Sequence, residues 1–126
     1  LRDCCLEGNG KKLNQNLGNV MIHNEDVFLC LNKLNYRIQI LINLKIQFQK
    51  DKNLDLAINN LTPKIFWKDK PVIMEQFRKW NLEKLGKAKK NVIETEIKMK
   101  TKFNNYNTLI IKYLLIKLFR LANSTS

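Results

Sequence analysis

The stretch NEDVFLCLNKLNYRIQILINLKIQF, residues 24–48, decides the fold class of this chain. Its apolar residues recur every three or four positions, a spacing that places them on one face of an α-helix. Asn24 suits the N-cap, and the two acidic residues after it complement the helix dipole. The apolar stripe comprises Val27, Leu31, Leu34, Ile38, Leu41 and Phe48, is interrupted at Lys45, and is widened by Phe28, Ile42 and Ile46. We therefore predict one long helix with a single buried face.

The same spacing continues on both sides of this helix, while glycine and proline are scarce. Further helices are expected at residues 1–6, 11–17, 54–61, 70–80, 82–101 and 108–121, with N-caps at Asn53, Asp69 and Asn81 and an extended linker at residues 65–68. In the helix of residues 82–101, the expected buried side comprises Leu82, Leu85, Ala88, Val92, Ile93 and Ile97. The prediction is an all-α helical bundle of about five to six helices. Residues 1–18 would lead into a main domain at residues 19–126.

The composition indicates a folded, strongly basic domain. The chain has 126 residues, 44% of them hydrophobic, and a formal net charge of +12 at pH 7. Such a charge favours an anionic partner, either nucleic acid or a membrane surface. The alternative is that the abundance of Lys, Asn and Ile only reflects an AT-rich genome. Few cysteines, no signal peptide and no long apolar run favour a cytoplasmic location.

No catalytic, cofactor or metal site is expected from the motifs. Gly10-Lys11 is followed by Lys12, so the chain lacks a P-loop. The only histidine is His23, and a nucleophilic pair with Cys30 would require a tertiary coincidence. The same shortage of ligands argues against a metal.

Two charge pairs stand out in the second half of the chain. Glu94 with Lys98, and Glu96 with Lys100, have the favourable i,i+4 order with Glu first. Glu96 falls at the edge of the expected apolar stripe, so we predict a structural ion pair with Lys100; a solvated pair is the alternative.

Trp67 is the candidate for contact with nucleic acid. Lys64, Lys68 and Lys70 flank it, and basic side chains around an aromatic ring can hold a strand while a base stacks. The alternative is a tryptophan in the core surrounded by solvated lysines.

An ordered set of segments resembles the C-terminal region of the delta subunit of the bacterial DNA polymerase III clamp loader. The segments are LRDCCLEGN (1–9), the long helix at 24–45, FWKDK (66–70), FRKWNLEKL (77–85) and EIKMKT (96–101). The resemblance covers essentially the whole chain.

This resemblance implies the helical collar domain of that subunit, which acts in DNA replication. The collar would join the collars of the other loader subunits in a five-membered ring, and the loader places the sliding clamp on primed DNA. The clamp would be gripped by AAA-like N-terminal domains that this chain does not contain. The domain would be a non-catalytic part of a DNA-directed DNA polymerase, a nucleotidyltransferase, without cofactor, metal or membrane.

The resemblance also implies a DNA-proximal set of residues. Trp67 stands at one aromatic position of the family, and Phe103, with Tyr106 second, at the other; Lys68 and Lys70 accompany Trp67. Phe103 lacks the phenol hydroxyl that the family usually has there. Two alternatives remain open: a stand-alone basic module that binds DNA or RNA, and a helical protein on a membrane surface. The second rests on Lys112, Lys117 and Arg120, which share one arc of the last helix.

Overall fold

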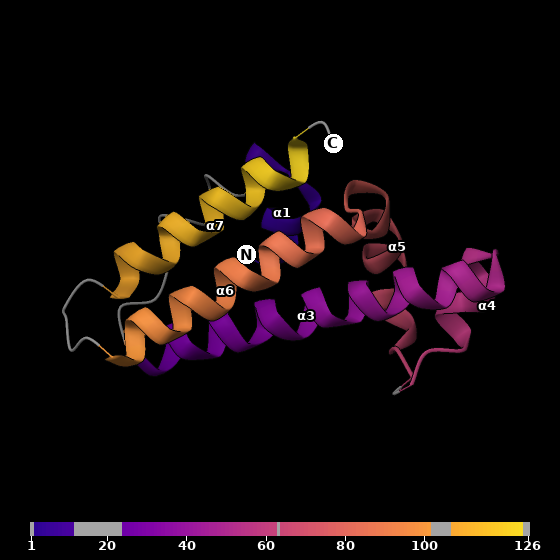
Figure 1. The fold of residues 1–126 in the computed structure, drawn as a ribbon, viewed down its shortest axis with the longest axis horizontal. Coiled ribbons are helices and arrows are strands. Elements are labelled where there is room, and N and C mark those ends of the chain that lie inside the picture. Colours follow the sequence, from indigo (N-terminus) through magenta and orange to yellow (C-terminus); the bar gives the residue numbers. More distant parts are fainter. Residues whose placement is uncertain (1, 12–23, 63, 102–106, 125–126) are drawn as a thin grey trace.

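The computed structural model describes residues 2–11, 24–62, 64–101 and 107–124 (Figure 1). Its elements in chain order are α1 (Arg2–Glu7), α3 (Asn24–Asp51), α4 (Leu54–Asn59), a 3-10 turn η1 (Trp67–Asp69), α5 (Lys70–Lys79), α6 (Leu82–Thr101) and α7 (Asn107–Asn123). All the regular structure within these ranges is helical, and the predicted all-α bundle is confirmed.

Helix α3 is the spine of the bundle. Its 28 residues correspond to about 42 Å at 1.5 Å per residue. Helix α6 runs back along α3, and α7 reverses again to pack on α6 (Figure 1). Helices α4 and α5 pack against α3, and α1 bridges α7 and α5. The chain thus forms an elongated bundle with its shorter helices gathered toward one end.

The buried face of α3 follows the predicted stripe with one shift. Leu31, Leu34, Ile38 and Leu41 are at most 1% exposed, as expected, but the stripe continues through Leu44 and not through Ile46, which is 45% exposed. Leu44 follows Leu41 by three residues, so it stays on the same face of the helix, whereas Ile46 is rotated away from it.

Lys45 fits beside this stripe because it lies on an aromatic face. Its Nζ is 3.5 Å from the ring centroid of Phe77, which in turn meets Phe48 edge-on at 5.4 Å. Partial burial lowers the pKa of Lys45. A cation over a ring is attracted by the ring quadrupole, which offsets part of that desolvation.

On α6 the predicted buried side is too wide. Leu85, Ala88 and Val92 are buried as expected, but Ile93 and Ile97 are 41% and 56% exposed. Leu82, at the start of the helix, is 38% exposed, and Met99 completes the buried row. Residue 93 lies about 100° around the helix from residue 92, so it leaves the core face.

Two of the four predicted N-caps are present as side-chain caps, and α3 begins at Asn24 itself, so this residue is helical and not the cap. Asn53 Oδ1 accepts from Leu56 N at 3.0 Å, and Asn81 Oδ1 accepts from Lys84 N at 2.8 Å. Asp69 makes no side-chain cap, because its backbone is already helical (ψ −16°) in the turn η1, which runs directly into α5. The prediction of an extended linker at 65–68 is therefore wrong for Trp67 and Lys68, which belong to η1.

Candidate nucleic-acid interface and basic groove

The turn η1 presents two neighbouring aromatic rings to solvent. Phe66 and Trp67 are 56% and 67% exposed, with ring centroids 5.9 Å apart and planes inclined by 49°. A backbone hydrogen bond from Asp69 N to Phe66 O, 2.9 Å long, closes the turn. The alternative that placed Trp67 in the core is wrong, since the ring is mostly in solvent. Trp67 is the first residue of η1, which runs directly into α5, so its ring projects from regular structure.

The lysines near Trp67 have different roles. Lys68 Nζ is 5.5 Å from the centroid of the Trp67 ring, so cation and ring share one surface. Lys70 Nζ instead donates to Asn59 Oδ1 at 2.9 Å and ties α5 to the end of α4. Lys64 is exposed and borders the cavity beside the turn. Of the three lysines, Lys68 and Lys64 are therefore available to contact the backbone of a nucleic-acid strand.

A cavity of about 250 Å³ opens next to these rings. It is lined by Arg2, Tyr36, Arg37, Ile40, Lys64, Ile65, Phe66, Asp69 and Ile73. Tyr36 is 59% exposed and lies between this cavity and a second hollow of about 170 Å³ toward Leu61. The sequence did not identify Tyr36 and Phe66 as site residues. Tyr36 lies on α3, and the sequence around it gives no local signal that residues of α5 will line the same cavity.

A partly buried polar cluster underlies the cavity. Asp3 Oδ1 accepts from Arg37 Nη1 and from Gln76 Nε2, both at 2.8 Å, and from Arg2 Nε at 3.1 Å. Arg37 Nη1 also donates to Gln76 Oε1 at 3.0 Å. Arg37 and Gln76 are 3% and 0% exposed. The cluster ties α1, α3 and α5 together and fixes the wall from which the aromatic turn projects.

The pKa values of Asp3 and Arg37 in this cluster are both lowered, but for different reasons. Burial would raise the pKa of Asp3, but hydrogen bonds from Arg2 and Gln76 and the charges of Arg37 and Arg2 outweigh it, so the pKa is lowered. Burial and the charge of Arg2 lower the pKa of Arg37, against the opposing effect of Asp3 and Asp69. Asp3 is therefore held as a carboxylate.

The ion pair between Glu96 and Lys100 is present on α6. Lys100 Nζ lies 2.8 Å from Glu96 Oε1, with the Glu96 side chain 32% exposed. In the described part of the chain, Glu94 and Lys98 form no such pair. Phe103 and Tyr106, the other aromatic candidates, and His23 lie outside the described residues.

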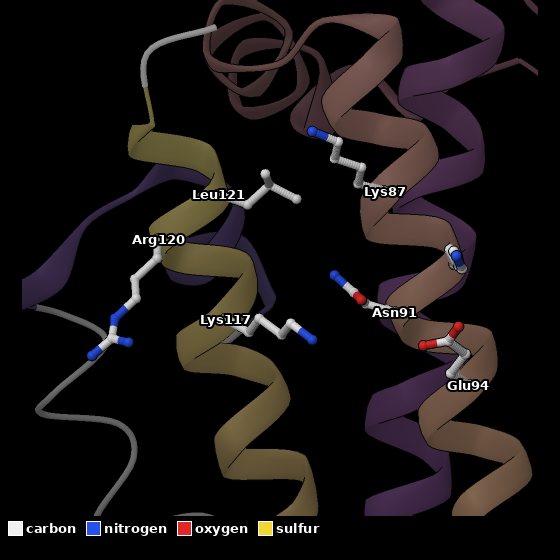
Figure 2. Close-up of a pocket in the computed structure, with 7 residues that line it drawn as sticks. Lys87, Asn91, Glu94, Lys117, Arg120 and Leu121 are labelled. Atoms are coloured by element: carbon white, nitrogen blue, oxygen red, sulfur yellow. The ribbon is translucent and has the colours of Figure 1, made fainter.

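A second, strongly basic site lies between α6 and α7. This α6–α7 groove has a volume of about 500 Å³ and is lined by Lys87, Lys90, Asn91, Glu94, Lys117, Arg120 and Leu121. Figure 2 shows Leu121, Lys117 and Asn91 extending into the space between the helices, while Arg120 points away from α6. Four cations and one carboxylate thus line the groove, with the Arg120 side chain directed away from α6.

Other lysines of α6 serve the fold. Lys84 Nζ donates to Ser124 O at 2.6 Å and to Ala122 O at 3.4 Å, which caps the end of α7. Lys89 donates to Gln39 Oε1 on α3. The lysines of α6 are therefore divided between structural contacts and the groove.

Comparisons with known proteins leave the site to be judged on its own geometry. Within the described ranges, no helix is both long and apolar enough to cross a bilayer. No protein-family model matches the chain, and no curated protein and no solved structure matched it in the comparisons.

Proposed function

We propose that this chain is the collar domain of a clamp-loader delta subunit: a non-catalytic assembly domain for DNA replication that also contacts primed DNA. The observation that carries the proposal is the exposed Phe66–Trp67 pair, held on a hydrogen-bonded turn with Lys68 beside it. The order of helices and the resembling segments support it. The cytoplasmic location and the place in a polymerase holoenzyme belong to the same proposal.

Exposed apolar side chains on two helices suit an assembly role. Ile93 and Ile97 on α6 are 41% and 56% exposed, and Leu109 and Tyr113 on α7 are 62% and 69% exposed. Each pair has i,i+4 spacing and therefore shares one helix face. Exposed apolar side chains that gather on one face are typical of surfaces that pack against another protein. We assign these faces to neighbouring collars, the other loader subunits; the sliding clamp would be bound by domains outside this chain.

The contact with DNA would be made by stacking. Every base has a π-face, so an exposed tryptophan can stack on a base of any sequence, while nearby lysines attract the backbone. The loss of one such stack costs about 1–3 kcal/mol, roughly a 5- to 150-fold weaker affinity. Because Lys68 adds a backbone contact, binding would also weaken as salt rises.

The test is binding of primed DNA by a loader reconstituted with the Trp67→Ala subunit. We expect the dissociation constant to rise by about 5- to 150-fold. Trp67→Phe, which keeps a ring, should retain most of the affinity. Sedimentation of each variant loader would verify assembly. Equal affinities of the wild-type and Trp67→Ala loaders at several salt concentrations would contradict the proposal.

The net charge of +12 favours one other candidate, a stand-alone nucleic-acid-binding module. That reading predicts tight binding of DNA or RNA by the 126-residue chain alone. If the chain does so and forms no complex with the collars of other loader subunits, the module replaces the collar proposal.

A further inference from the structure

None of the seven residues that line the α6–α7 groove takes part in the function proposed above, its continuation shares only Tyr113 with the apolar faces assigned to neighbouring collars, and its chemistry is distinct from that of the aromatic turn. We propose that it is a docking site for an acidic amphipathic helix of a partner protein. The proposal is independent of the DNA contact at Trp67, because the groove is built by other helices and contains none of the same residues.

The charge of the groove selects an anionic partner. Lys87, Lys90 and Lys117 line it and Arg120 stands on its outer side, against the single carboxylate of Glu94 (Figure 2). Lys87 lies 3.5 Å from Glu83 in an exposed pair, which water screens and a ligand can displace. Within the described ranges, Lys90, Lys117 and Arg120 have no acidic partner within 4.0 Å.

The shape of the groove favours a helix as the occupant. A smaller hollow of about 80 Å³ continues it along α6 and α7, sharing Asn91, Glu94 and Lys117 and adding Lys98, Ile110 and Tyr113. From Lys87 to Lys98 the groove follows 12 residues of α6, about 17 Å or three helical turns. The aliphatic residues that line the two hollows are Leu121, Ile110 and Leu114, and a channel between two helices with such contacts accepts the apolar face of a third helix, with acidic residues along its edges.

Glu94 and Leu121 argue for a peptide over a nucleic acid. Glu94 is the one carboxylate among the residues that line the groove, and it repels the evenly spaced phosphates of a nucleic acid, whereas the acidic side chains of a helix can be placed so that none faces it. Leu121, which points from α7 toward α6, offers an aliphatic wall, and the larger hollow has no aromatic ring among its lining residues on which a base could stack (Figure 2). A second copy of the chain is disfavoured because each copy carries a net charge of +12.

The test uses fluorescence anisotropy with the full 126-residue chain. The probe is a labelled peptide of about 15 residues, roughly four helical turns, with Leu at i, i+3, i+4 and i+7 spacing and Glu elsewhere. A peptide with Gln in place of each Glu and a thymidine oligonucleotide of equal charge are the comparison ligands.

The matched variants remove equal charge inside and outside the groove. Lys90→Glu with Lys117→Glu reverses two groove cations, while Lys33→Glu with Lys52→Glu reverses two exposed lysines that do not line it. We expect the groove variant to bind the Glu peptide at least about tenfold more weakly, since like charges then face one another. The control variant and Trp67→Ala should bind it as the wild type does. Circular dichroism would verify that both double variants fold.

Three results would overturn the inference. The Glu peptide could fail to bind, or bind no better than the Gln peptide. The two double variants could lose affinity equally, which would show attraction to net charge alone. The oligonucleotide could bind more tightly than the peptide and depend on Lys90 and Lys117, which would make the groove a nucleic-acid site.

Discussion

Replacement of Asp3 by asparagine would test the polar cluster that joins three helices. The shape of the side chain is kept, but the charge that Arg37 and Arg2 face is removed. Asp3 Oδ1 accepts from Arg37 and Gln76 at 2.8 Å, and Oδ2 accepts from Arg2 Nη2 at 3.3 Å. The amide nitrogen of asparagine, if it replaced Oδ2, would face a donor. Arg37, 3% exposed, would be left without its carboxylate.

The expected loss of stability follows from the hydrogen bonds that Asp3 accepts and from its exposure to solvent. Hydrogen bonds to charged groups contribute about 1.5–3 kcal/mol each to stability. Asp3 keeps 38% of its side-chain exposure, so solvent screens it, and we take the lower end, about 1.5 kcal/mol. Because folding lowers the pKa of Asp3, its contribution is present above the unfolded-state pKa, near 3.9, and is lost as pH falls through the folded value. The difference between wild type and Asp3→Asn should hold at pH 7 and shrink only below about pH 4.

Urea unfolding at several pH values measures this difference. Trp80 is 2% exposed and is the reporter, so both proteins would carry Trp67→Phe to remove the exposed ring. Asp55→Asn, an exposed carboxylate in the first turn of α4, is the control and should cost only about 0.3–0.5 kcal/mol. An Asp3→Asn protein as stable as wild type at pH 7, or a difference that already fades near pH 6, would refute the reasoning.

Two further pairs of substitutions make similar changes at two sites that differ in their surroundings. Gly8 has φ +71° and an added Cβ would lie 2.4 Å from Asn123 Oδ1, so Gly8→Ala should destabilise by more than about 1 kcal/mol, whereas Gly86→Ala, in open space on α6, should stabilise by about 0.5–1 kcal/mol. Melting temperatures that both substitutions shift in the same direction would contradict this. Leu41→Ala, at a 0% exposed site, should cost about 2–5 kcal/mol, and Ile46→Ala, at a 45% exposed site, clearly less in chemical denaturation. Equal losses would mean that the α3 stripe is misplaced.

The sequence predicted the helices better than the faces they bury. Helical spacing and the Asn53 and Asn81 caps are local, so they can be recognised without knowing the neighbours. Which residues at the edge of a stripe are buried depends on how wide the contact with the next helix is. For this reason the prediction that Ile93 and Ile97 are buried is wrong: the face of α6 that packs against its neighbours is narrower than the arc over which its apolar residues are spread.

The candidate sites were predictable only in part. The aromatic residue among lysines at Trp67 is a local pattern, but its exposure is a tertiary fact. Tyr36 joins that surface from another helix, which no spacing could indicate. The contact of Asp3 with Gln76, 73 residues apart, likewise depends on how α1 returns to α5.

The two candidate sites follow different rules, and this difference bears on how the domain works. At the aromatic turn, the proposed affinity for DNA would come from flat rings, which suit any base and therefore a ligand of variable sequence. In the α6–α7 groove, a carboxylate and an aliphatic wall sit among cations, an arrangement that rejects a uniform polyanion and accepts a patterned one. Sites that share no residue and differ in selectivity can be occupied at once. A collar with both would hold DNA at one surface and a specific protein segment at another, so changes at either site should leave the other's affinity unchanged unless helices α3 and α6 move relative to each other.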